Sequence, residues 1–115
     1  MAKKLSAAEA AKLDDLERKC SDAQSSLRGA EKNIEGCDQF LAEAEVALSL
    51  EEVSDASKAN WKARKEHCEK VQRPREVEER AIKAALLAKA EKDLSQEKGK
   101  HGPTLKKVDG EWVTE

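Results

Sequence analysis

Aromatic residues, glycine and proline are scarce in this chain of 115 residues. It contains one Phe, two Trp, no Tyr, five Gly and two Pro. So few aromatic side chains exclude a thick globular core, and so few Gly and Pro leave few points at which a helix must stop. With 38% hydrophobic and 40% charged residues, the composition is typical of long helices or a coiled coil. The core must therefore be a thin apolar strip.

Long apolar runs are also absent. No stretch approaches the roughly 20 apolar residues of a membrane span, and the first residues lack the apolar segment of a signal peptide. We therefore expect a cytoplasmic protein that does not use a membrane. The cysteines are odd in number (Cys20, Cys37 and Cys68), which argues against a secreted disulfide framework and favours reduced thiols.

The chain does have one unbroken apolar pattern, with spacings that alternate between three and four residues. This spacing is typical of the seam of a long helix packed against another helix. The seam comprises Leu13, Leu16, Cys20, Ala23, Leu27, Ala30, Ile34, Cys37, Leu41, Ala44 and Leu48. Such a helix needs a partner for its apolar face, and the second half of the chain is nearly as long as the first.

We therefore predict an all-α protein, a long antiparallel helical hairpin or coiled coil. Ser6 and Glu9 match a capping box at the start of the first arm, whereas Ser49 to Glu52 and Ser54 to Ser57 are two candidate starts for the second arm. Gly99 indicates where the second arm ends, and Gly102-Pro103 prevents any continuation of the helix. The predicted organisation is a tail over 1–5, a hairpin over 6–99 (arms about 6–48 and 57–98, turn about 49–56) and a β-hairpin or tail over 100–115.

Charge supports this antiparallel pairing. Residues 35–52 carry six acidic and no basic side chains, whereas 58–75 carry seven basic side chains against two acidic ones. A turn near residue 52 places the two blocks side by side, and complementary charges of this kind select orientation. The same turn places Cys37 level with Cys68, where a disulfide would require an oxidising setting.

The second arm contains two irregularities. Pro74 removes one backbone donor, so we expect a kink or a break there. Farther along, from Ala81 to Ala90, only two lysines interrupt an apolar run, and Ala81, Ala84 and Ala88 lie on one stripe. A helix that is apolar on nearly every side needs more than one neighbour, which predicts self-association or a bound partner at this stripe.

Two further features concern the surface. A lane of mostly small residues follows the first arm beside the seam, which either admits a second backbone closely or consists of tolerated glycines; its members are Asp22, Ser26, Gly29, Asn33, Gly36 and Phe40. Near the C-terminus, Asp109-Gly110 is typical of a β-hairpin turn, with Trp112 as the expected anchor on the helices or on a partner.

No motif indicates catalysis, a cofactor or a metal. His67 and Cys68, with Cys20, Cys37 and His101, lack the paired spacing of a zinc site. Adjacent residues of a helix point about 100° apart, so His67 and Cys68 do not form a nucleophile and base pair. A thin helical protein also offers no enclosed cleft in which two carboxylates acquire different pKa values. We predict that the protein is not an enzyme.

The predicted function is that of a non-catalytic interaction or assembly protein, which binds protein partners and forms homo-oligomers. The candidate partner-binding residues are Phe40, Trp61, Ala81, Ala84, Ala88 and Trp112. A monomeric inhibitor or adaptor that binds through its aromatic residues is one alternative. Nucleic-acid binding is a less favoured alternative, because the acidic arm neutralises the basic segment that it would need, formed by Lys58, Lys62, Arg64, Lys65, Lys70, Arg73 and Arg75.

Overall fold

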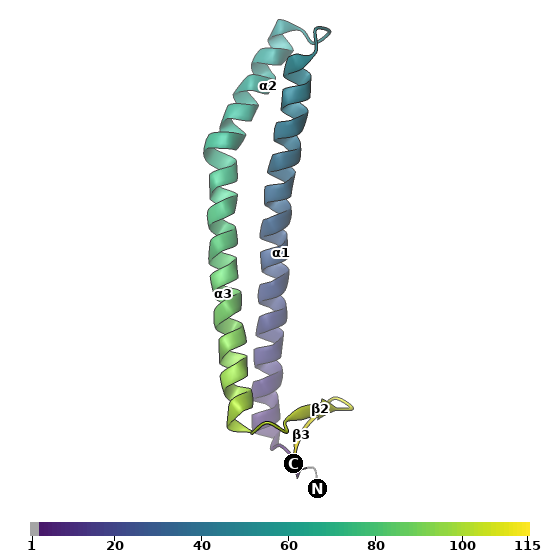
Figure 1. Cartoon of the computed structure of the whole chain (residues 1–115), viewed down its shortest axis with the longest axis vertical. Helices are drawn as coiled ribbons and strands as arrows, with labels where there is room; N and C mark the ends of the chain where they lie inside the picture. Colours follow the sequence, from purple (N-terminus) through teal and green to yellow (C-terminus); the bar gives the residue numbers. More distant parts are fainter. Residues whose placement is uncertain (1–2) are drawn as a thin grey trace. The chain divides into compact units, whose positions relative to one another are not determined.

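The computed structural model describes residues 3–115 and is predominantly helical (Figure 1). Its elements follow one another as β1 (Lys3–Lys4), α1 (Ala7–Ser49), α2 (Asp55–His67), the π-helical turn η1 (Cys68–Gln72), α3 (Arg73–Lys100), β2 (Lys106–Val108) and β3 (Glu111–Thr114). The predicted helical hairpin with a small C-terminal β-structure is confirmed.

The chain forms two compact units. Unit 1 comprises Met1–Ser25 and Ala84–Glu115, and unit 2 comprises Ser26–Lys83. In unit 1, Lys12 on α1 pairs with Glu97 on α3, with Nζ 3.2 Å from the carboxylate oxygen Oε2.

Unit 2 shows the same antiparallel pairing between the acidic and basic blocks. Asp38 on α1 pairs with Arg73 on α3, where Nε lies 2.8 Å from Oδ1, and Glu45 pairs with Lys65 on α2 at 4.0 Å. These pairs connect the two charge blocks in the orientation that the sequence predicts. They are largely exposed, so they select the orientation of the arms more than they stabilise it.

The start of α1 is the predicted capping box. The Ser6 backbone N–H and hydroxyl both donate to the Glu9 carboxylate, at 3.3 and 2.8 Å, and the Glu9 backbone N–H donates to the Ser6 hydroxyl at 3.2 Å. These reciprocal bonds satisfy backbone donors that a helix otherwise leaves open at its first turn.

The seam of α1 forms most of the core. All eleven seam residues are buried or half-buried, and Leu13 and Ala44 are 0% exposed. Most of the buried positions carry short side chains. The buried group comprises Leu13, Cys20, Ala30, Ile34, Cys37 and Ala44. The core is therefore a narrow strip on one face of α1, as expected for a helix that contacts a single neighbouring arm.

Of the two candidate starts of the second arm, only one is used. The Ser54 hydroxyl accepts a hydrogen bond from the Ser57 backbone N–H at 3.2 Å and caps α2. Ser49 does not cap a helix. Its hydroxyl donates to the Val46 carbonyl oxygen at 2.7 Å, so Ser49 remains the last residue of α1.

The second arm bends before Pro74 and does not break. Pro74 lacks the N–H that would donate to the Lys70 carbonyl, and its ring requires space at that carbonyl. The π-helical turn η1 widens the arm there, with the Arg73 backbone N–H donating to the Cys68 carbonyl five residues back. The ribbon changes direction between α2 and α3 at this point (Figure 1).

The end of the second arm differs from the prediction. Gly99 lies inside α3, which continues to Lys100. Gly102 has a φ of 92°, a conformation that favours glycine, and Pro103 follows it. The stop signal is therefore Gly102-Pro103, because Gly99 keeps a helical conformation without any need for its freedom.

The C-terminal segment forms a sheet with one more strand than predicted. β2 and β3 pair antiparallel around Asp109 and Gly110, whose φ values of 51° and 78° suit a two-residue hairpin turn. β1 then adds to the other edge of β3, giving the order β1-β3-β2. The predicted N-terminal tail over 1–5 is thus wrong for Lys3 and Lys4, and Met1 and Ala2 lie outside the described residues.

Trp112 attaches the sheet to α1 within unit 1. Its side chain is 5% exposed, and its Nε1–H donates to Asp14 Oδ1 at 2.8 Å. Lys107 Nζ contacts Asp14 and Glu17 on the same helix at 3.1 and 3.2 Å. A two-stranded hairpin is marginal in water, so this attachment, together with β1, explains why the C-terminal segment is ordered.

Candidate functional site

Unit 2 contains a groove of about 700 Å³ between α1 and the second arm. The α1 wall includes Asn33, Gly36 and Phe40, and the opposite wall includes Arg64 and Gln72. The complete lining is Lys32, Asn33, Gly36, Cys37, Phe40, Ala63, Arg64, His67, Cys68, Gln72 and Glu76. The widened turn η1 contributes Cys68 and Gln72, so the irregularity before Pro74 forms part of the groove wall.

An aromatic and guanidinium stack borders the groove. The Phe40 and Trp61 rings stack with centroids 5.7 Å apart and an interplanar angle of 23°. The Arg64 guanidinium carbon lies 4.9 Å from the Phe40 ring centroid and 5.3 Å from the Trp61 centroid. Offset rings and a cation over their faces attract one another. Phe40 and Arg64 contact each other in this stack, and both line the groove.

Two cysteines lie at the base of the groove. Cys37 and Cys68 are buried and free, and the Cys68 thiol donates to the Cys37 carbonyl oxygen with Sγ 3.9 Å away. Burial raises the pKa of the Cys68 thiol, so it stays protonated at neutral pH and is a poor nucleophile. The pair thus lies level across the two arms, as the position of the turn predicts, and serves as small apolar packing.

The small-residue lane of α1 is open to solvent beside this groove. At Gly36, which lines the groove, and at Gly29, two steps earlier in the lane, an added Cβ would meet no atom within 4 Å. Asn33 between them is exposed as well. The second arm of the same chain therefore does not use the close approach that these glycines permit.

A second exposed surface lies on α3 in unit 1. Leu87, Ala90 and Leu94 are half-buried, whereas four apolar residues between positions 84 and 88 face solvent. These exposed apolar residues, which we call the alanine patch, are Ala84, Ala85, Leu86 and Ala88. Leu86 is 53% exposed. Ala81 and Ile82, which precede the patch in unit 2, are exposed too.

The basic segment is only partly available to a polyanion. Lys65 pairs with Glu45 and Glu69, Lys70 pairs with Glu66 at 2.7 Å, and Arg73 pairs with Asp38. Arg64 lies over aromatic rings. Hydrogen bonds and charge from Glu66 raise the pKa of Lys70, and those from Asp38 raise the pKa of Arg73. Acidic partners within the chain therefore already pair with three of the seven basic side chains that a phosphate backbone would contact.

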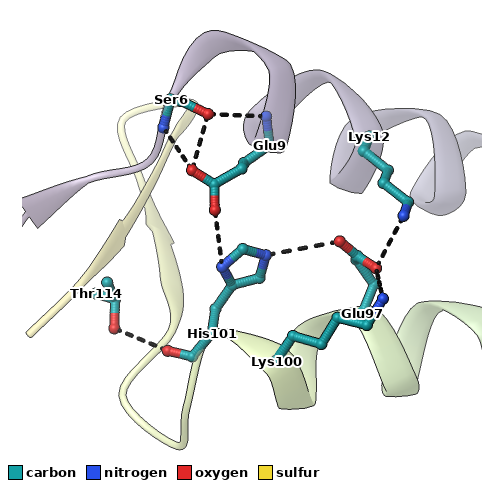
Figure 2. Close-up of polar contacts among 7 residues, drawn as sticks. All are labelled: Ser6, Glu9, Lys12, Glu97, Lys100, His101 and Thr114. Atoms are coloured by element: carbon teal, nitrogen blue, oxygen red, sulfur yellow. Dashed lines mark hydrogen bonds and ion pairs between the residues drawn. The ribbon is translucent and has the colours of Figure 1, made fainter.

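A polar cluster connects the ends of α1 and α3 in unit 1 (Figure 2). The His101 ring is 10% exposed and lies between two carboxylates, with Nδ1 3.5 Å from Glu9 and Nε2 3.8 Å from Glu97. Lys12 and Lys100 contact Glu97 at 3.2 and 3.1 Å. Among the described residues, His101 Nε2 has no hydrogen-bond partner. The His101 carbonyl accepts from the Thr114 hydroxyl at 3.2 Å, which connects the cluster to β3.

Acid is expected to destabilise unit 1. Hydrogen bonds from Ser6 lower the pKa of Glu9, those from Trp112 and Lys107 lower the pKa of Asp14, and Lys100 and Lys12 lower the pKa of Glu97. A carboxyl group whose pKa is lower in the folded chain than in the unfolded chain stabilises the fold at any pH above its unfolded pKa. This stabilisation is lost as the pH falls through the folded pKa. We expect the urea midpoint of a Trp61→Phe variant, followed by Trp112 fluorescence, to fall between about pH 5 and pH 2.

The matched control replaces the three carboxylates by Glu9→Gln, Asp14→Asn and Glu97→Gln. Its midpoint at pH 5 should be lower than that of the parent and should change less with acid. A parent midpoint that is constant from pH 5 to pH 2 would show that these carboxylates contribute nothing to folding.

No protein family, curated protein or solved structure matches this chain. Among the described residues, no helix combines the length and apolar character needed to cross a membrane. The part of the chain from 3 to 115 also lacks any group of three or more His, Cys, Asp or Glu side chains placed to hold a metal ion. The function must therefore be argued from the groove and the alanine patch themselves.

The structure locates the predicted partner-binding residues in different settings. Phe40 and Trp61 lie in the stack at the groove, and Ala81, Ala84 and Ala88 are exposed on α3. Trp112 is buried against α1, so it anchors the sheet and is not free to meet a partner. Sequence reasoning missed the groove as a whole and the environment of His101. The small-residue lane was the only available signal for the groove.

Proposed function

We propose that this protein is a non-catalytic assembly protein that self-associates through the alanine patch. The observation that carries the proposal is the exposure of Ala84, Ala85, Leu86 and Ala88 on a helix whose Leu87, Ala90 and Leu94 are half-buried. A helix that is apolar on nearly every side is normally covered on more than one side. One arm of the chain's own hairpin covers only one face, so a second chain is the economical partner for the other.

Small side chains favour a helix as the covering element. Alanine lets two helix backbones approach closely, and close approach increases the number of dispersion contacts along the line of contact. The long aliphatic stems of Lys83 and Lys89, which flank the patch, extend the surface that a second helix would cover.

The double substitution Ala84→Glu and Ala88→Glu is expected to convert an oligomer into a monomer. It places two carboxylates at the centre of the proposed interface, where burial without a partner is costly. Sedimentation velocity at equal protein concentrations measures the change in mass, and far-UV circular dichroism reports whether the helices remain.

The control variant carries the same two substitutions at exposed alanines elsewhere, Ala7→Glu and Ala11→Glu in α1. It has the same net charge and the same spacing, and it should keep the parent mass. A patch variant with the parent mass and parent helicity would refute the role of the alanine patch.

A further inference from the structure

Two thiols meet across the arms of unit 2. Cys37 lies on α1 and Cys68 is the first residue of η1, and Cys68 Sγ lies 3.9 Å from the Cys37 carbonyl oxygen. Burial raises the pKa of the Cys68 thiol, and a hydrogen bond with the Cys37 side chain raises it further, so the two thiols themselves face each other. Side chains that face each other at close range meet the first geometric requirement of a disulfide.

The groove gives a small molecule access to both sulfurs. Cys37 and Cys68 are 3% and 2% exposed, so a bulky reagent does not reach them from the outer surface. Both residues line the groove of about 700 Å³, however, and hydrogen peroxide is far smaller than this space. Of the three cysteines, Cys20 does not line the groove. The pair that is close in space is therefore also the pair that a small oxidant reaches.

We propose that Cys37 and Cys68 are a modification site, which hydrogen peroxide converts into a disulfide that joins α1 to η1. One cysteine gives up its proton and its sulfur attacks a peroxide oxygen. The O–O bond breaks, a sulfenic acid forms, and the displaced hydroxide takes up the proton as water. The second sulfur then attacks the sulfenic sulfur, the S–O bond breaks, and the oxygen leaves as a second water with the proton of the second thiol. Peroxide accepts the two electrons that the thiols lose.

The disulfide has two consequences for unit 2. It closes a loop from residue 37 to residue 68 that contains the turn between the arms, and this closure restricts the unfolded chain. The oxidised chain should therefore unfold at a higher urea concentration than the reduced chain. The raised pKa keeps the Cys68 thiol protonated at neutral pH, so oxidation should be slow there and faster in mildly alkaline solution. Neither consequence depends on self-association.

Mass spectrometry identifies the pairing directly, because trypsin places the three cysteines on separate peptides. These peptides are 20–28 for Cys20, 33–58 for Cys37 and 66–70 for Cys68. The folded chain, treated with hydrogen peroxide in mildly alkaline solution, should lose two hydrogens from its intact mass. Its digest should contain 33–58 linked to 66–70, and a phosphine reductant should restore the parent mass. In concentrated urea, the same treatment should give mixed pairings that include Cys20.

Two single variants form matched controls, since each keeps two cysteines. Cys20→Ala retains the proposed pair, so it should form the disulfide and show the increase in urea midpoint after oxidation. Cys37→Ala retains Cys20 in unit 1 and Cys68 in unit 2, and it should show neither change. Circular dichroism compares the helicity of the parent and of both variants before oxidation.

The link within a single folded chain decides between the outcomes. Linked peptides 33–58 and 66–70 from a species with the mass of one chain support the proposal. Folded chains whose thiols stay reduced, while the chain in urea is oxidised, overturn it. Pairing with Cys20 in the folded chain as often as in urea also overturns it. Because the mass of one denatured chain is measured, these results do not depend on whether the alanine patch mediates assembly.

Discussion

Replacing Ala44 by glutamate is expected to unfold most of unit 2. Ala44 is 0% exposed on the seam of α1, so a glutamate there either buries an unpaired carboxylate or separates the two arms. An uncompensated buried charge costs about 3 to 5 kcal/mol, and a domain of this size has a free energy of unfolding of about 5 to 15 kcal/mol. A core only one strip wide offers no second layer that can rearrange around the change.

The matched control is Ala42→Glu, two residues away on the exposed face of the same helix. It makes the same chemical change and should alter the free energy of unfolding by no more than about 0.5 kcal/mol. Urea unfolding followed by circular dichroism at 222 nm compares the two variants with the parent. Equal midpoints for both variants would show that Ala44 is not packed between the two arms.

Replacing Trp112 by alanine is expected to release the sheet from α1. The substitution removes a side chain that is 5% exposed and leaves Asp14 without its closest donor. Removing a buried tryptophan costs about 3 to 5 kcal/mol. Since an isolated small sheet is marginal in water, we expect strands β1, β2 and β3 to lose their order while most of the helical content remains.

Hydrogen exchange measured by NMR tests this expectation at single amides. The Leu5 backbone N–H, which donates to the Trp112 carbonyl at 3.2 Å, should lose its protection in the alanine variant, whereas amides around Ile34 in unit 2 should keep theirs. Trp112→Phe, which keeps an aromatic ring but lacks the donor, should fall between the parent and the alanine variant. Continued protection of Leu5 in the alanine variant would mean that Trp112 does not anchor the sheet.

The parts of the fold that the sequence predicts are those governed by local rules. The capping box at Ser6, the cap at Ser54 and the turn at Asp109-Gly110 each depend on residues within a few positions of one another. The seam of α1 is a regular repeat over a long stretch, for which the helical period is unambiguous. The antiparallel pairing of this seam with the second arm is predicted from the position of the turn and from the two charge blocks, which are opposite in sign.

The remaining features depend on contacts between residues far apart in the chain. β1 is two lysines long, and neither its composition nor its length indicates a strand; it forms because the edge of β3 is adjacent. His101 acquires carboxylate neighbours from both α1 and α3. A proline predicts a disturbance in a helix, but whether a kink, a break or a π-helical turn results depends on the packing of both arms.

The candidate site was only partly predictable for the same reason. The small-residue lane and Phe40 indicate one wall of the groove, yet the other wall depends on η1, whose backbone pattern the sequence does not specify. Lys65, Lys70 and Arg73 form a basic segment in the sequence, whereas the structure pairs each of them with a carboxylate. The sequence predicts Trp112 as an anchor on the helices or on a partner, and the structure shows it on α1. The choice depends on which side of the sheet faces α1, which the sequence does not specify.

The native mass in solution tests the central claim most directly. Light scattering over a dilution series, at low and at high salt, measures whether the chain exists as a monomer of 12.7 kDa or as a larger species. The proposed assembly predicts a mass of at least two chains that falls toward one chain on dilution. A mass of one chain at every concentration and both salts would contradict it.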